Sequence, residues 1–157
     1  MEDESSNIYK APESDLSTTQ NADDVNNFER FSAWAVFGLS IITFGIYPLY
    51  WLFTRAKTVN TFHSNLISPK MIMATGIIFI INIVFQVLAG VYEENMAIVS
   101  SSALINLVYL VFYLILLFSL RNRIRDIIGK SVNPVFTFFA SAIYLQYKIN
   151  VAIDENE

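Results

Sequence analysis

Residues 43–51 read TFGIYPLYW and lie inside an apolar run, residues 31–53, that contains no charged side chain. A helix of 23 residues is about 34 Å long, which is enough to cross the roughly 30 Å hydrocarbon core of a bilayer. Gly45 and Pro48 interrupt helical geometry, because glycine favours turns and proline cannot donate the helical hydrogen bond. The chain therefore either crosses a membrane here as a kinked helix or turns back within it.

The composition predicts a membrane protein. Of the 157 residues, 54% are apolar, and the mean hydropathy of +0.46 is too high for an ordinary soluble domain of this size. Two further charge-free runs, residues 71–92 and 97–120, are each long enough to cross a bilayer. We expect an all-α integral membrane helical bundle with a central transmembrane hairpin (71–92 and 97–120). A broken first helix (31–57) and a short fourth helix (132–148) flank this hairpin.

The charges are concentrated outside the apolar runs. Residues 1–29 hold eight of the fourteen acids and a single base, Lys10, among many small polar side chains. Such a segment buries too little apolar surface to offset its loss of conformational entropy, so we expect it to be disordered. We expect a helical membrane domain over residues 30–150 and an acidic C-terminal tail over residues 151–157. The chain contains no cysteine, which excludes disulfides and cysteine-based metal sites.

The basic residues predict the orientation of the hairpin. The connection 93–96 carries two glutamates and no base, whereas the connections 54–70 and 121–131 carry seven bases between them. Because cytoplasmic connections are enriched in Lys and Arg, we expect 54–70 and 121–131 to be cytoplasmic and 93–96 to be external. The seven bases are Arg55, Lys57, Lys70, Arg121, Arg123, Arg125 and Lys130.

Two arrangements remain open for the first run. If residues 31–53 span the membrane, the acidic tail is external. If the run is re-entrant, Gly45 supplies the turn and the tail stays cytoplasmic. The residues after the turn then form an interfacial helix, on which Tyr47, Tyr50 and Trp51 share one face, as in an aromatic belt.

The apolar stretch 132–147 raises the same question as the first run. With both segments half-inserted, all ten Lys and Arg lie on one side of the membrane. With both spanning, the bases divide seven against three. The charge rule favours half-insertion, whereas the length of the first run makes a full span physically easier. The sequence leaves both arrangements open.

Two short motifs carry a resemblance to a known family. The pattern T-x-G-I-Y-x-x-Y-W followed by a basic residue, Arg55, resembles the signature of small bacterial membrane proteins catalogued as domain of unknown function 4234. The ending Y-L-Q-Y-K-I-N is similar to the C-terminal end of that family, so the resemblance covers roughly residues 32–150. It implies a compact, helical protein of the bacterial inner membrane with no established activity, although Pro48 departs from the family pattern. The motif residues are Thr43, Gly45, Ile46, Tyr47, Tyr50, Trp51, Tyr144, Gln146 and Asn150.

The hairpin carries three neutral polar side chains. Asn82 and Gln86 are four residues apart on one face of the first helix, and Asn106 lies at a similar depth on the second. We favour hydrogen bonds between the two helices, because unpaired amides are costly in lipid. A polar stripe that lines a conduit or meets a partner helix is the alternative.

The basic segment 121–130 follows the hairpin directly. Leu120, Ile124, Ile127 and Ile128 fall on one helical arc, so the segment is either a surface helix on anionic lipid or a cluster that only orients the hairpin. We favour the orienting role. The residues with this lipid or topology assignment are Arg55, Lys57, Arg121, Arg123, Arg125 and Lys130.

Catalytic signatures are missing from the sequence. It shows no nucleophile–base pair, phosphate loop or metal-ligand spacing, and its single histidine, His63, lies in a basic connection. The three long runs contain no ionisable residue, which argues against an active transporter. We therefore predict no enzyme, no cofactor and no nucleic-acid partner. The expected role is interaction with the bilayer, with a membrane-protein partner or with further copies of the chain. The alternative is an oligomeric small-solute channel or an accessory transport subunit.

Overall fold

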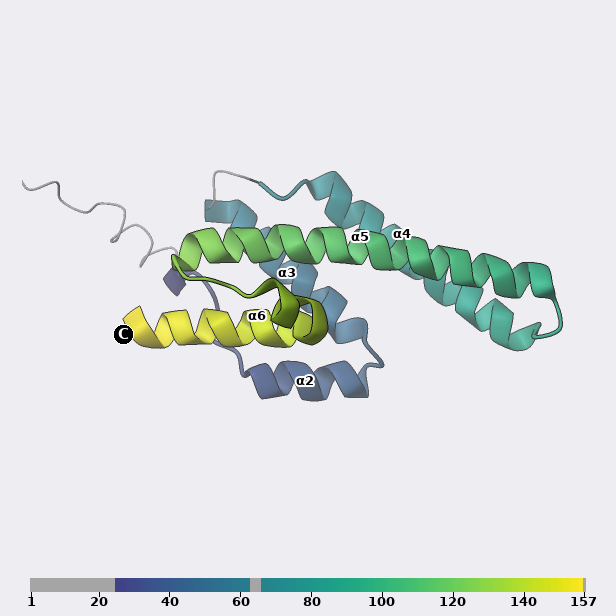
Figure 1. Cartoon of the computed structure of the whole chain (residues 1–157), viewed down its shortest axis with the longest axis horizontal. Coiled ribbons are helices and arrows are strands. Elements are labelled where there is room, and N and C mark those ends of the chain that lie inside the picture. Colours follow the sequence, from purple (N-terminus) through teal and green to yellow (C-terminus); the bar gives the residue numbers. More distant parts are fainter. Residues whose placement is uncertain (1–24, 63–65, 157) are drawn as a thin grey trace, which may run out of the picture.

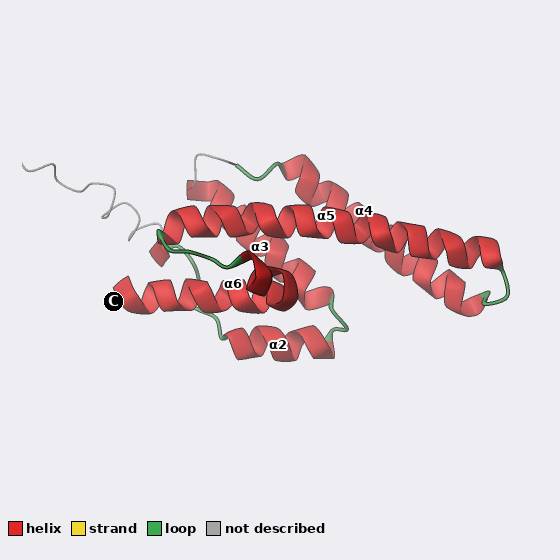
Figure 2. Cartoon of the chain, viewed as in Figure 1, coloured by secondary structure: helices red, strands yellow, loops and turns green. Residues whose placement is uncertain are grey.

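The computed structural model describes residues 25–62 and 66–156, and this part of the chain is helical (Figure 2). Five helices follow one another, and no strand occurs in the described residues, so the all-α prediction is confirmed. Most of the acidic segment expected to be disordered, and His63, lie outside the described residues. The helices are α2 (Ala33–Ile42), α3 (Ile46–Phe62), α4 (Pro69–Val91), α5 (Met96–Ile128) and α6 (Pro134–Asn156).

Helices α4 and α5 form the antiparallel hairpin that the sequence predicts, and its turn end projects away from the other helices (Figure 1). The hairpin forms because local signals place both ends of its turn. Val91 ends α4, and the Asn95 side chain caps α5 by accepting hydrogen bonds from the amides of Ala97 and Ile98. With 23 and 33 residues, α4 and α5 are about 35 Å and 50 Å long.

The last third of α5 packs with α2, α3 and α6 into what we call the bundle. Val25 and Phe28 are also buried in it, so ordered packing begins within the segment 1–29. The prediction of disorder is wrong for these two residues, because their side chains find an apolar core to join. Fully buried side chains of this core include Trp51, Leu52, Leu116, Leu117, Leu120, Ile124, Leu145 and Ile149.

Helix α5 is continuous past the predicted end of its span at residue 120. Leu120, Ile124, Ile127 and Ile128 do fall on one arc, but all four are buried in the bundle. The possibility that this arc lies on lipid is therefore wrong. Apolar periodicity shows that a face avoids water and does not show what covers it.

The first apolar run is broken where the sequence predicts. Helix α2 ends at Ile42 with Thr43 as its C-cap, and the amides of Gly45 and Phe44 bond back to the carbonyls of Ser40 and Ile41, the pattern of a Schellman motif. Phe44 (φ 50°) and Gly45 (φ 85°) are both left-handed, and α3 then begins at Ile46. A single helix across residues 31–53 is thereby excluded. Helix α3 runs to Phe62 rather than to residue 57.

Helix α6 is interrupted and longer than predicted. Ser141 has non-helical angles (φ 46°, ψ −125°), so residues before and after it form two helical pieces. The second piece continues to Asn156, past the predicted end at residue 148 and through the segment expected to be an acidic tail. Burial of Ala152 and Ile153 and a 2.6 Å ion pair between Asp154 and Arg30 hold this part on the bundle.

Candidate functional site

The two sequence motifs meet in the core of the bundle. Trp51 of α3 donates a hydrogen bond from its indole Nε1 to Oε1 of Gln146 in α6, at 2.8 Å. Both side chains are buried. A buried indole N–H needs an acceptor, and Gln146 Oε1 supplies it, while the indole satisfies the amide oxygen in return.

Arg55 joins the same contact. Its guanidinium NH2 donates to Gln146 Oε1 at 3.2 Å and to the backbone carbonyl of Glu29 at 2.9 Å. Burial lowers the pKa of Arg55 from its ordinary value, and the nearby Glu29 carboxylate opposes this shift. The sequence predicted only a topology or lipid-binding role for Arg55, and not this contact. Its spacing of four residues from Trp51, which places both on one helix face, was the available signal.

Asn150 completes the set of contacts. Gln146 donates from Nε2 to Asn150 Oδ1 at 2.8 Å, and Asn150 donates from Nδ2 to the carbonyl of Phe31 at 2.7 Å. We call Trp51, Arg55, Gln146 and Asn150 the motif network. It connects α6 to α3 and to the segment that leads into α2, across as many as 119 residues of sequence.

The first part of the motif builds the turn between α2 and α3. The Thr43 hydroxyl donates to the carbonyl of Leu39 at 2.7 Å and accepts from the amide of Tyr47 at 2.9 Å. Pro48 has no amide hydrogen, so its position in the first turn of α3 leaves no donor unpaired. The first turn of α3 therefore has no unpaired amide hydrogen at Tyr47 or Pro48. Ile46, the next motif residue, is exposed.

The aromatic residues of the motif do not form the single interfacial face that was predicted. Trp51 is buried, Tyr50 is 60% exposed, and Tyr47 lies between these extremes, with its ring 6.3 Å from that of Phe31. A belt requires all three rings at the surface, so this prediction is wrong for Trp51. Tyr47, Tyr50 and Arg55 instead border a cavity of about 520 Å³. Tyr144 lies apart, where its hydroxyl accepts from the amide of Asn133 at 3.0 Å.

The three amides of the hairpin lie together. Gln86 donates to Asn82 Oδ1 at 3.2 Å, and Asn82 donates to Asn106 Oδ1 at 3.4 Å. The link between the helices therefore runs through Asn82, which is buried, rather than directly from Gln86 to Asn106. Because Asn82 donates to one amide and accepts from the other, this contact supports a packing role.

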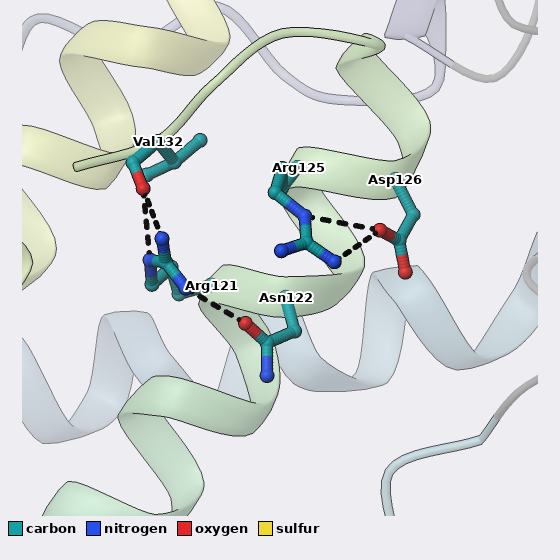
Figure 3. A network of polar contacts seen from close by, with 5 residues as sticks. All are labelled: Arg121, Asn122, Arg125, Asp126 and Val132. Carbon is teal, nitrogen blue, oxygen red and sulfur yellow. Dashed lines mark hydrogen bonds and ion pairs between the residues drawn. The ribbon is translucent and has the colours of Figure 1, made fainter. Parts of the chain in front are cut away.

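The basic residues at the end of α5 contact the chain itself (Figure 3). Arg121 donates from Nε (3.0 Å) and from NH2 to the carbonyl of Val132, and from NH1 to Asn122 (2.9 Å). Arg125 pairs with the adjacent Asp126 at 3.1 Å, and Lys130 pairs with Glu155. Arg121 thus holds the loop before α6 in place. Arg123 is half-buried, and Lys57 is exposed.

No group of three His, Asp or Glu side chains that could hold a metal ion occurs within residues 25–62 and 66–156. The buried polar side chains of the described residues are amides, threonine hydroxyls, an indole and a guanidinium, which are hydrogen-bonding groups. This arrangement of groups can hold the helices together and can bind a ligand through hydrogen bonds.

A family model described as "Domain of unknown function (DUF4234)" matches residues 31–126. The match includes Trp51 and Arg55 and ends before Gln146 and Asn150. No curated protein and no solved structure matches the chain.

Proposed function

Because the chain belongs to the DUF4234 family, whose function is unknown, we propose its role on physical grounds: it is a small multi-pass membrane protein that catalyses no reaction. It acts through contacts with lipids or with a membrane-protein partner. The bundle lies at the cytoplasmic face of the inner membrane, and the α4–α5 hairpin crosses the membrane.

The exposure of α4 and α5 carries this proposal. Both helices are long and apolar enough to cross a membrane, yet only 17% of the most apolar stretch of each is buried. The core helix of a soluble protein would be covered by other elements. Exposed Ile, Leu and Val side chains along both helices would meet water at a cost of about 25 cal/mol per Å², and a bilayer removes that cost.

Exposed aromatic side chains support half-insertion of the α2–α3 turn and of the first piece of α6. Phe44, at the α2–α3 turn, is 96% exposed, and Phe139, in the first piece of α6, is 80% exposed. The amides of residues 43–47 are all hydrogen-bonded, which irregular backbone in contact with lipid requires. Helix α2 spans about 15 Å, half of a bilayer core.

The charges support the orientation. The C-terminal ends of α3, α5 and α6 lie at one end of the molecule, opposite the hairpin turn, and α4 begins nearer its middle (Figure 1). Arg123 and Arg125 lie in the last two turns of α5 and Lys130 just after it, whereas the hairpin turn carries Glu93 and Glu94. The positive-inside rule then makes the bundle end cytoplasmic.

Cysteine accessibility in intact cells tests the proposal. The chain has no native cysteine, so single substitutions are clean reporters. We expect Glu94→Cys to react with an impermeant thiol reagent added outside. Thr61→Cys and Asn26→Cys should react only after the cells are permeabilised. All three positions are exposed, so each thiol is accessible to the reagent from its own side of the membrane.

Two results would overturn this topology. Labelling of Thr61→Cys but not Glu94→Cys from outside would invert the orientation. Labelling of Asn26→Cys from outside would place the N-terminal segment on the far side and exclude half-insertion of α2 and α3. The channel alternative requires several copies around a shared polar surface, so the stoichiometry in mild detergent separates it from the proposed role.

A further inference from the structure

A groove of about 400 Å³ lies between α3 and the first turns of α4. It is separate from the motif network, although both use α3. The residues of the groove that matter here are Phe53, Lys57, Asn60, Ile72, Met73 and Gly76.

A close approach of the two helices delimits the groove. Phe53 of α3 lies against Gly76 of α4, where a Cβ atom would come within 3.3 Å of the Phe53 ring. Gly76 therefore allows the two helices to approach closely, and a larger residue at this position would push them apart. Nearer the helix ends, the Asn60 side chain holds the connection by pairing with both backbone groups of Ile67, at 2.7 and 2.8 Å. The Phe53–Gly76 contact and the Asn60–Ile67 hydrogen bonds thus lie at the two ends of the groove.

The polarity of the groove changes along its length. Helix α3 runs toward the connection and α4 runs away from it, so Lys57 and Asn60 lie toward the connection at Pro69. The apolar part follows, formed by Phe53 and Met73. A polar, basic end beside the start of a membrane helix and an apolar end toward its middle match the two halves of a phospholipid.

The charge at the polar end takes part in no ion pair with the described residues. Lys57 is exposed, and among the described residues no carboxylate lies within ion-pair distance of it. Lys70 follows Pro69 in the first turn of α4 and is likewise without such a pair in the described chain. No acid lines the groove; Lys57 also borders the neighbouring cavity of about 520 Å³, which Glu29 lines.

We propose that this groove binds one anionic phospholipid. The headgroup phosphate lies at Lys57, and an acyl chain follows Phe53, Met73 and Gly76. Basic pockets between membrane helices on the cytoplasmic side bind anionic headgroups, and the groove is within the usual size of ligand sites. The proposal rests on the proposed function, because it needs the start of α4 at a bilayer surface, and it names the lipid class that this site takes.

Native mass spectrometry of the full chain in mild detergent tests this site. Phosphatidylglycerol and phosphatidylcholine are titrated separately, and the first bound lipid is quantified. We expect phosphatidylglycerol to bind more tightly. We expect Lys57→Gln to weaken its binding about fivefold, the factor for about 1 kcal/mol per basic residue. Met73→Trp should also weaken binding, because it fills the apolar part without changing the charge.

Lys148→Gln, on α6, is the matched control, because it removes the same charge from outside the groove. It should leave the first binding step unchanged. Equal losses for Lys57→Gln and Lys148→Gln would show general attraction to anionic lipid and overturn the site. Displacement of the lipid by millimolar glycerol 3-phosphate would overturn it in favour of a soluble phosphate ligand. Because cysteine labelling reports topology independently, failure of this site and failure of the proposed function can be distinguished.

Discussion

Trp51 and Gln146 are 95 residues apart in the sequence and share a buried hydrogen bond of 2.8 Å between indole Nε1 and amide Oε1. The bond joins α3 to α6 at the centre of the motif network. Loss of Gln146 leaves the indole N–H of Trp51 buried and unpaired, which costs more than the bond itself contributes, whereas Gln146 Oε1 keeps Arg55 as a donor if Trp51 is lost. This pair is therefore expected to be a main source of cohesion in the bundle.

Gln146→Leu tests that expectation. The substitution removes the oxygen that accepts hydrogen bonds from Trp51 and Arg55, and it removes the Nε2 group that donates to Asn150. We expect the free energy of unfolding in mild detergent to fall by about 1–3 kcal/mol. Trp51→Phe should also destabilise, and the double variant should lose less than the sum, because the two residues share one contact. Tyr147→Phe, at an exposed neighbour, should change stability little. Additive losses would contradict the coupling.

Thr43→Val tests the turn between α2 and α3. Valine keeps the branched shape and removes the hydroxyl that accepts from the Tyr47 amide. We expect a loss of about 1–2 kcal/mol in the free energy of unfolding and faster hydrogen exchange at Tyr47. Thr43→Ser keeps the hydroxyl and should behave like the parent chain. Unchanged exchange at Tyr47 in Thr43→Val would show that another acceptor supports the turn.

The hairpin amides allow a second test of coupling. Asn82→Leu and Asn106→Leu each remove the contact between Asn82 and Asn106. Each should lower stability by roughly 0.6–2 kcal/mol without affecting membrane insertion, and their effects should be non-additive. Differential scanning calorimetry in detergent measures the thermal stability. Additive or stabilising effects would mean that these amides serve a surface outside the hairpin.

Two glycines on the first apolar run should respond in opposite directions. Gly38 lies inside α2 with open space where a Cβ atom would lie, so Gly38→Ala should raise stability by about 0.5–1 kcal/mol. Gly45 has φ +85°, so Gly45→Ala should lower stability by about 1–2 kcal/mol. Chemical denaturation of both variants in one detergent measures the difference. A neutral Gly45→Ala would contradict the left-handed turn.

Arg121→Lys tests the loop between α5 and α6. Arginine offers two nitrogens to the Val132 carbonyl in a fixed geometry, which a single ammonium cannot reproduce. We expect faster hydrogen exchange across residues 129–133 and a loss of about 1 kcal/mol. Arg125→Lys alters an exposed pair between neighbours and should leave this exchange unchanged. Equal exchange in both variants would show that the loop does not depend on Arg121.

Local features of the sequence determined the helical elements. Charge-free runs of more than 20 residues specify the α4–α5 hairpin, and a short connection with two carboxylates, Glu93 and Glu94, separates its arms. Gly45 and Pro48 specify a break in the first run, because they restrict the backbone at their own positions. The spacing of Asn82 and Asn106 from the hairpin turn also sets their shared depth. Each of these conclusions depends on residues close together in the chain.

The tertiary structure decided what covers each apolar face. The arc of α5 from Leu120 to Ile128 lies on the bundle rather than on lipid, and Trp51 lies in the core rather than at an interface. It also brought Arg55 and Gln146 together, which are 91 residues apart. Hydrophobic periodicity measures the avoidance of water, and protein and lipid both exclude water. Only contacts between distant segments distinguish the two.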